Sequence, residues 1–297
     1  MGGAQLRAAM DARLVHAPGC ADALGALLIE RAGFSAVYVS GFALAATSLG
    51  VPDLGLIGLA DVAGAVRRIT SVVQVPVIAD IDTGFGGPLN VRRTVAEVEA
   101  AGAAAVQIED QVAPKRCGHF EDKAVVPVAE AVERVAIAVD ARWSADTVVI
   151  ARTDAVAVEG IDAAIERARS FVEAGADVVF VEALEDVDQL RRVNAALPGV
   201  PLLYNAVEGG RSPMLDAATL EAAGVRVLLH PISLLLATIR AQQDALAALG
   251  AGRPATTATI ALAREVVGAD EALAALQRSV LWGGATHQKP RRRKKTG

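Results

Sequence analysis

Four acidic residues could together hold a metal ion. Asp80 and Asp82 follow a short apolar run and stand two positions apart, so on a strand their side chains face the same way. Two carboxylates aimed at one point repel each other unless a cation or a proton lies between them. With Asp53 and Glu109 they make an all-oxygen set that suits Mg²⁺, which keeps several waters and needs one or two direct carboxylates. The alternative is that Asp80 and Asp82 cap the next helix or pair with nearby arginines.

A cysteine lies in a basic segment, Lys115-Arg116-Cys117-Gly118-His119. A thiol flanked by two cations and an imidazole should have a lowered pKa and be reactive. The alternatives are a small buried hydrophobic residue or a Cys–His hydrolase pair, although Cys117 and His119 stand too close in sequence for the usual pair drawn from separate elements. No second cysteine or spaced histidine pair accompanies the segment, so the sequence does not predict a zinc site.

Arg152 and Tyr38 also follow or end apolar runs. The guanidinium fork of Arg152 matches the geometry of a substrate carboxylate, and the alternative is an internal salt bridge with Glu109 or Glu182. Tyr38 is either a proton-transfer group or a core aromatic residue whose hydroxyl finds a partner. Both alternatives stay open from the residues alone.

Eight short apolar runs must position these residues. Their length, β-branched content and lack of alternation predict buried parallel strands. The runs cover residues 14–17, 36–39, 75–79, 105–108, 148–151, 178–181, 201–204 and 227–229. The side chains considered above lie at or just after the ends of these runs, where a barrel of parallel strands collects its catalytic groups.

Helical stretches separate the predicted strands, and several end in the same Ala-Gly pair, in which glycine takes the left-handed conformation that ends a helix. Strands alternating with helices over about 230 residues predict an α/β fold, a single (β/α)8 TIM-type barrel. An open doubly wound sheet is the alternative, but the glycine-rich turn that such a sheet usually carries after its first strand is missing at residues 19–23.

The chain continues beyond the eighth strand. We expect a helix at residues 233–249 and another at 258–281. A barrel needs only one helix after its last strand, so the second helix is an addition to the barrel. The predicted organisation is a catalytic barrel at 1–250, a C-terminal helical extension at 251–288 and a disordered basic tail at 289–297. The extra helix is expected to pack on a neighbouring subunit.

Composition limits the classes of protein. Of 297 residues, 53% are hydrophobic and 21% are charged, which excludes a disordered chain. A net charge of −5 argues against nucleic acid as a partner. Two cysteines provide no disulfide framework, and we find no signal peptide or run long enough to span a membrane, so we expect a cytoplasmic protein with no membrane partner.

Several segments, in their order along the chain, resemble those of the isocitrate lyase and phosphoenolpyruvate mutase superfamily. The resemblance covers roughly residues 10–250. It is carried by Ser40-Gly41, Leu49-Gly50-Val51-Pro52-Asp53-Leu54-Gly55, Asp80-Ile81-Asp82-Thr83-Gly84-Phe85-Gly86, Ile108-Glu109-Asp110-Gln111, Lys115-Arg116-Cys117-Gly118-His119, Ala151-Arg152-Thr153-Asp154-Ala155 and Val207-Glu208-Gly209-Gly210.

The resemblance implies a barrel enzyme that uses Mg²⁺ or Mn²⁺ and acts on small carboxylates, usually as a homotetramer that exchanges its last helices between neighbours. Asp80 would be the direct metal ligand, with Asp53, Asp82 and Glu109 acting largely through water. Ser40 and Gly41 would bind the 2-oxo acid portion of the substrate together with Arg152. Phe42, Gly118, Glu182 and Asn205 complete the implied substrate contacts, and Lys115 and His119 join Cys117 and Tyr38 as implied catalytic residues.

The basic cysteine segment is similar to that of the lyase branch, which includes 2-methylisocitrate and 2-alkylmalate lyases. This implies cleavage of a 2-hydroxy di- or tricarboxylate into a 2-oxo acid, with Tyr38 as the base and Cys117 as the proton donor to carbon. The alternatives are an oxaloacetate acetylhydrolase and a phosphonate mutase of the carboxyphosphonoenolpyruvate or phosphoenolpyruvate type. A catalytically inactive barrel would be expected to lose some of the acidic residues, and none is missing.

Overall fold

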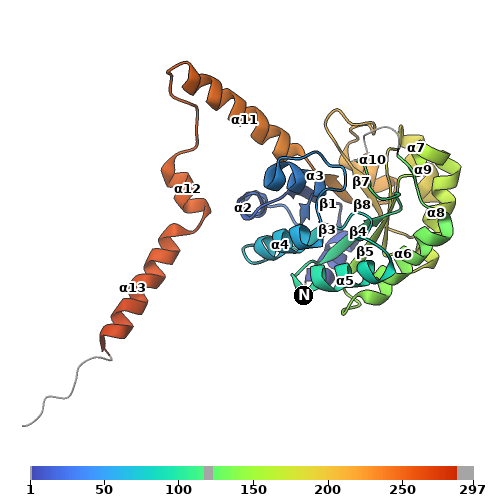
Figure 1. The fold of residues 1–297 in the computed structure, drawn as a ribbon, viewed down its shortest axis with the longest axis horizontal. Coiled ribbons are helices and arrows are strands. Elements are labelled where there is room, and N and C mark those ends of the chain that lie inside the picture. The colour runs from blue at the N-terminus through green and yellow to red at the C-terminus, as the bar shows by residue number, and fades with distance from the viewer. Residues whose placement is uncertain (1, 117–122, 286–297) are drawn as a thin grey trace, which may run out of the picture. The chain divides into compact units, whose positions relative to one another are not determined.

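The computed structural model describes residues 2–116 and 123–285. Eight parallel strands close into a barrel in chain order, each paired with the next and β8 with β1, so the predicted (β/α)8 fold is confirmed (Figure 1). Each of the eight apolar runs overlaps one strand, with ends that differ by up to three residues. Their bounds are β1 (Val15–Cys20), β2 (Val37–Val39), β3 (Val77–Asp80), β4 (Ala105–Glu109), β5 (Val148–Thr153), β6 (Val178–Val181), β7 (Leu202–Asn205) and β8 (Val225–His230).

Side chains of the strands alternate between the inside of the barrel and the surrounding helices. Tyr38, Ile78, Ile150, Phe180 and Leu229 belong to one buried cluster that fills the interior. The intervening residues pack against the helices in two further buried clusters. The interior is therefore a packed core, as in other barrels of this class, and it leaves space for ligands at the ends of the strands.

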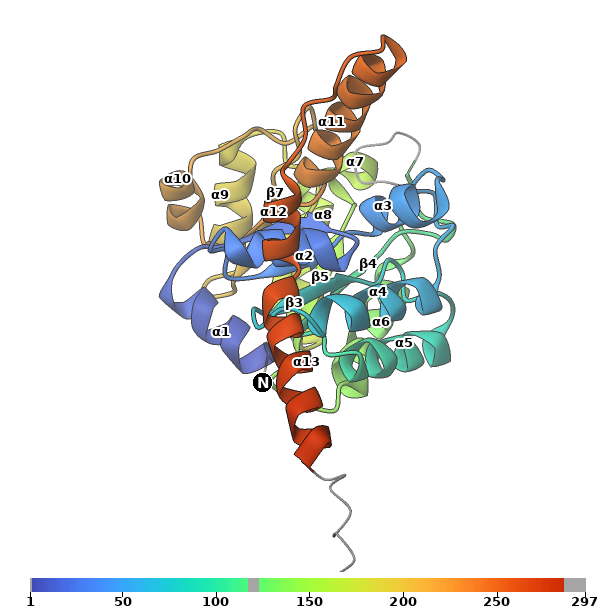
Figure 2. The same ribbon diagram turned by 90° about the vertical axis from the view of Figure 1, so that its left-hand side faces the viewer.

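Helices surround the barrel, and neighbours such as α4, α5 and α6 pack on one another in turn. Figure 2 shows these three along one side and α9 and α10 along another. Glycines with positive φ follow four of the helices, at Gly33, Gly102, Gly175 and Gly224, as the Ala-Gly pairs predict. The helices are α1 (Gly2–Ala12), α2 (Ala23–Arg31), α3 (Gly41–Leu44), η1 (Ala45–Leu49, a π-helix), α4 (Leu59–Thr70), α5 (Pro88–Ala100), α6 (Val128–Ala141), α7 (Val156–Glu159), α8 (Ile161–Glu173), α9 (Val187–Ala196) and α10 (Ala217–Ala222).

The C-terminal region contains α11 (Ser233–Gly250), α12 (Ile260–Val266) and α13 (Ala269–Ala285), and a first compact unit ends at Gln243. The prediction of one helix over residues 258–281 is wrong. Gly268 takes a left-handed φ of 64°, which separates α12 from α13. Among the helices of the described residues, none is both long and apolar enough to cross a membrane.

Polar residues follow several strands at their carboxyl ends. Asp80 is the last residue of β3, Glu109 of β4 and Asn205 of β7, while Arg152 lies one residue before the end of β5. Because all strands are parallel, these ends meet at one face of the barrel. The fold therefore brings together side chains that stand far apart in sequence.

Candidate active site

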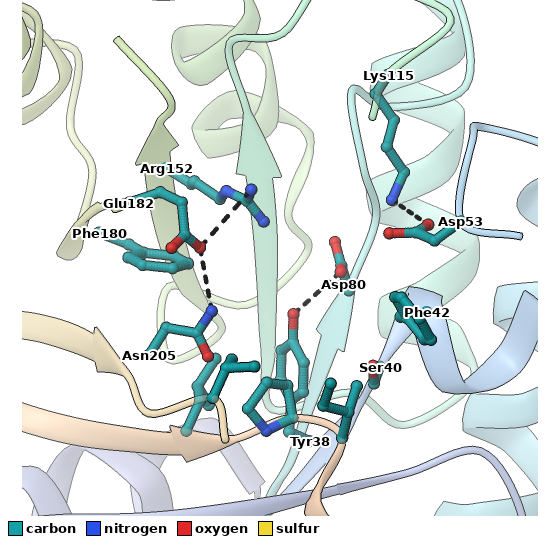
Figure 3. A pocket seen from close by; sticks show the side chains of 14 residues that line it. Tyr38, Ser40, Phe42, Asp53, Asp80, Lys115, Arg152, Phe180, Glu182 and Asn205 are labelled. Carbon is teal, nitrogen blue, oxygen red and sulfur yellow. Dashed lines mark hydrogen bonds and ion pairs between the residues drawn. The ribbon is translucent and has the colours of Figure 1, made fainter. Parts of the chain in front are cut away.

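A cavity of about 480 Å³, counting space open to solvent, lies at the carboxyl ends of the strands. Figure 3 shows its polar side chains in three groups: Arg152 with Glu182 and Asn205, Tyr38 with Asp80, and Lys115 with Asp53. Nine predicted site residues line it, namely Tyr38, Ser40, Phe42, Asp53, Asp80, Lys115, Arg152, Glu182 and Asn205. The other lining residues in the described part of the chain are apolar: Phe180, Val207, Leu229, Pro231 and Ile232.

Asp80 is held from two sides. Its Oδ2 accepts a hydrogen bond of 3.0 Å from the Tyr38 hydroxyl, and its Oδ1 accepts one of 3.1 Å from the backbone N–H of Asp82. The Gln107 amide donates in turn to the Tyr38 hydroxyl at 3.0 Å. The Asp80 carboxylate is thereby fixed in orientation at the wall of the cavity.

Lys115 lies between two other acidic residues. Its Nζ donates to Asp53 and is 2.9 Å from Asp82 Oδ1. Burial lowers the pKa of Lys115, but the surrounding carboxylates, led by Asp82 and Glu109, outweigh burial and raise this pKa above its ordinary value. The ammonium group therefore stays protonated. Lys115 therefore offsets part of the negative charge at this end of the barrel.

Arg152 is surrounded by acidic residues. Its Nε and Nη2 donate to both oxygens of Asp154 at 2.8 and 2.9 Å, while Nη1 is 3.2 Å from Glu109 and Nη2 is 3.7 Å from Glu182. The guanidinium also lies over the ring of Phe180, 5.3 Å from its centroid. Arg152 thus makes the internal ion pairs that the sequence left open as an alternative, and it lines the cavity as well.

Ser40 and Gly41 begin α3 beside these acidic residues. Ser40 Oγ accepts a hydrogen bond from the backbone N–H of Ala43 at 3.3 Å and caps this short helix. A Cβ placed on Gly41 would lie 3.3 Å from Asp80 Oδ2 and 3.4 Å from Asp82 Oδ1. Glycine therefore leaves room next to both carboxylates. Gly41, Asp82 and Glu109 do not line the cavity themselves but adjoin residues that do.

Unpaired buried oxygens mark where a cation fits. Across residues 2–116 and 123–285, Asp82 Oδ2 and Glu109 Oε1 are buried without a hydrogen-bond partner. Such atoms cost free energy unless a cation or water approaches them. In the same ranges no three His, Cys, Asp or Glu side chains are gathered as a ready-made ligand set. This is compatible with one direct carboxylate and others acting through water, so these residues fit Mg²⁺.

The pKa shifts indicate a deficit of positive charge. Burial raises the pKa of Asp82 to about 7, Lys115 opposes this shift, and Asp80 and Asp53 add to it. Burial also raises the pKa of Glu109 well above its ordinary value, in spite of Arg152. Burial and the Asp80 carboxylate likewise raise the pKa of Tyr38. Tyr38 is therefore a neutral donor among these groups, and its predicted role as a base needs further positive charge nearby.

Three predicted site residues, Cys117, Gly118 and His119, lie outside the described residues, and their roles stay predictions. Sequence reasoning missed Phe180 and Gln107. Gln107 could have been noticed as a polar residue inside an apolar run, whereas Phe180 carries no such signal. His230 does not line the cavity: its ring stacks on His16, with centroids 5.7 Å apart.

The fold and the site define an α/β-barrel protein with a polar cavity lined by acidic residues and a buried arginine. A family model described as phosphoenolpyruvate phosphomutase matches residues 6–249. The chain belongs to this family, within the PEP mutase/isocitrate lyase superfamily, as the sequence predicts.

Relatives of known name are similar over most of the chain. A 2,3-dimethylmalate lyase of Eubacterium barkeri is 44% identical over 237 residues, which are 80% of this chain and 82% of that protein. A 2-methylisocitrate lyase of Escherichia coli (strain K12) is 48% identical over 226 residues, 76% of each chain. These identities confirm the prediction of an enzyme of the carbon–carbon lyase type, similar to 2-methylisocitrate lyase.

Solved structures agree with this placement. An oxaloacetate acetylhydrolase in complex with 3,3-difluorooxalacetate superposes with a TM-score of 0.90 at 34% identity, covering 94% of this chain and 97% of that one. A 2,3-dimethylmalate lyase superposes with a TM-score of 0.89 at 36% identity, covering 94% and 95%.

Proposed function

We propose that this enzyme is a Mg²⁺-dependent lyase. It cleaves the C2–C3 bond of a 2-hydroxy di- or tricarboxylate, of the 2-methylisocitrate or 2-alkylmalate type, into a 2-oxo acid such as pyruvate and a second carboxylate such as succinate. The observation that carries the proposal is a cavity lined by Asp80 and the buried Arg152, with the unpaired carboxylate oxygens of Asp82 and Glu109 buried next to its lining. The lyase names of relatives at 44% and 48% identity support it.

The donor set supports a divalent cation. Asp80 would hold it directly, with Asp53, Asp82 and Glu109 acting through water, and the cation would polarise the C2 hydroxyl and carboxylate of the substrate. A phosphonopyruvate hydrolase of the same fold, 33% identical, was solved in complex with oxalate and Mg²⁺. Mn²⁺ is expected to serve in place of Mg²⁺.

The lining of the cavity offers groups for both ends of such a substrate. Ser40, Gly41 and Arg152 would bind the 2-oxo acid portion, whereas Glu182 and Asn205 would orient the other carboxylate-bearing fragment. The apolar wall, which includes Phe42 and Phe180, has no charge to offer and would contact the alkyl substituent.

The proton transfers fall to two residues. Tyr38, in its phenolate form, takes the proton of the C2 hydroxyl, the oxygen forms a double bond to C2, and the electron pair of the C2–C3 bond passes to C3. Cys117, aided by Lys115 and His119, then gives its proton to C3, so the departing fragment leaves as a carboxylate. Gly118 would contribute to substrate binding, as the resemblance implies.

Two alternatives share the barrel and the metal. An oxaloacetate acetylhydrolase would need an activated water, and a phosphonate mutase would need no proton donor from outside the substrate. By superposition, structures of the hydrolase and of a 2,3-dimethylmalate lyase are similar to this chain to nearly the same degree, at 34% and 36% identity. The named relatives at 44% and 48% identity are both lyases. The lyase is therefore preferred.

Product identification tests the proposal. The purified protein would be incubated with 2-methylisocitrate, 2,3-dimethylmalate, other 2-alkylmalates or oxaloacetate, each with Mg²⁺ and with EDTA, and the products followed by NMR. We expect a 2-oxo acid from at least one hydroxy acid, with Mg²⁺ alone. Cleavage of oxaloacetate alone, to oxalate and acetate, would instead assign the hydrolase.

We further propose a homotetramer that exchanges its last helices between subunits. The C-terminal helices expose large apolar side chains that a partner could cover, among them Leu246, Leu249, Ile260, Leu273 and Leu276. Light scattering on the eluting protein should give the mass of about four chains. A monomer at micromolar concentration would contradict the proposal.

A further inference from the structure

Asp154 is a buried carboxylate for which the proposed reaction has no use. It follows β5, has no exposed surface and does not line the cavity. Both of its oxygens are nevertheless bound to Arg152, which does line the cavity, at 2.8 and 2.9 Å. Any effect of Asp154 on a ligand must therefore act through Arg152.

The contact selects which edge of the guanidinium is free. Asp154 occupies Nε–H and one N–H of Nη2, so the N–H groups left for a ligand are those of Nη1 and the second one of Nη2. Glu109 and Glu182 lie on this remaining side, at 3.2 and 3.7 Å. These two contacts are longer than the paired bonds to Asp154.

Asp154 itself is firmly placed. Its backbone N–H donates to Asp110 Oδ1 at 2.9 Å, and the preceding Thr153 hydroxyl donates to Asp110 Oδ2 at 2.7 Å. Lys123 donates to Asp154 Oδ1 at 2.9 Å. Burial raises the pKa of Asp154, but Arg152 and Lys123 outweigh burial and bring it to about 2, so the carboxylate stays ionised at neutral pH.

We propose that Asp154 is a positioning residue that holds Arg152 toward the cavity and so sets the affinity for a substrate carboxylate. Without it, Arg152 would keep only its contacts with the buried acids Glu109 and Glu182, and the guanidinium would shift toward them. A bidentate pair has a fixed geometry, which a single shifted contact does not reproduce. This inference rests on the proposed function in that the ligand is a carboxylate.

The test measures binding apart from turnover. Oxalate, with saturating Mg²⁺, would be titrated calorimetrically into the native protein and into Asp154→Asn, which keeps the shape of the side chain and removes its charge. We expect oxalate affinity to fall about 10–100-fold, the scale on which misplaced binding groups act. With a cleaved substrate, KM should rise by a similar factor while kcat changes less than about three-fold.

Glu159→Gln is the matched control. Glu159 also binds a buried arginine through two bonds, of 2.8 and 2.9 Å to Arg167, but it does not contact Arg152. The affinity of the Glu159→Gln variant for oxalate should equal that of the native protein. If Asp154→Asn does not fold, Asp154→Glu keeps the charge, displaces it by one methylene, and should still bind oxalate at least about ten-fold more weakly.

Native oxalate affinity in a folded Asp154 variant would overturn the proposal. So would a fall in kcat alone, because that would place Asp154 in the chemical step. If the native protein does not bind oxalate, Arg152 does not serve as a site for a ligand carboxylate, and the proposal is wrong. Oxalate binding without turnover of any hydroxy acid would count against the proposed function and leave the role of Asp154 standing.

Discussion

Lys115 is the cation on which the acidic side of the cavity depends. It pairs with Asp53 and Asp82, and the side chains of all three are almost fully buried, with exposed fractions of 6%, 6% and 4%. Lys115→Met keeps much of the length of the side chain and removes its charge. Both carboxylates would then be buried without their partner, and we expect the metal-free barrel to lose stability.

The size of the loss follows from burial. Removing one partner of a buried ion pair costs roughly 3–5 kcal/mol, because a charge is left uncompensated. Asp82 can escape part of this cost by taking up a proton, because loss of Lys115 would raise its pKa above the value of about 7 that it has beside that ammonium group. The loss should therefore be largest near pH 8 and smaller near pH 5. At about 2–4 °C per kcal/mol for a domain of this size, Tm should fall by about 6–20 °C.

Thermal unfolding in EDTA at pH 8 and pH 5 measures this effect. The matched control is Arg92→Met, because Arg92 pairs with Asp140 on the surface, with exposed fractions of 51% and 69%. An exposed pair contributes at most about 1 kcal/mol. Mg²⁺ should restore more stability to Lys115→Met than to the native protein. A variant that melts within about 2 °C of native at pH 8 would refute the reasoning.

Three further predictions concern the metal, the thiol and pH. EDTA should abolish turnover and Mg²⁺ or Mn²⁺ restore it, and Asp80→Asn should weaken Mg²⁺ binding, measured by calorimetry, by at least about ten-fold; full activity in metal-free buffer would contradict this. Cys117→Ser should lose roughly 10²–10⁴-fold in kcat but still bind oxalate; near-native turnover would favour the mutase alternative. Because the folded-state pKa of Asp82 is raised from 3.8 to about 7, its contribution to stability is present at low pH and lost as pH rises through 7. Melting in EDTA should show this loss, and Asp82→Asn should remove it; an unchanged profile would exclude Asp82 as the titrating group.

The strands and the acidic residues could be predicted from sequence because each leaves a local signal. Strands of a parallel barrel are buried on both faces, so they appear as unbroken apolar runs. Asp80 and Glu109 interrupt the apolar pattern where a strand ends, which is where such a fold collects its functional groups. Neither inference needs knowledge of which strands are neighbours.

Other parts of the site depend on contacts that sequence does not display. Phe180 lies within a wholly apolar run, and its place beside Arg152 follows from the register of β5 and β6. Lys115 meets Asp53 across 62 positions of the chain. The break between α12 and α13 was missed because a single glycine inside a helical pattern is often tolerated. Its left-handed φ shows that Gly268 ends the helix here.

The central claim is that the enzyme breaks a C–C bond and protonates the carbon that departs. The most direct measurement is turnover in D₂O with the hydroxy acid that the substrate panel identifies, with the products examined by NMR and mass spectrometry. We predict one deuterium per molecule at the cleaved carbon of the second carboxylate, and none added by the enzyme to the 2-oxo acid. A product without solvent deuterium at that carbon, or no cleavage of any hydroxy acid in the presence of Mg²⁺, would contradict the account.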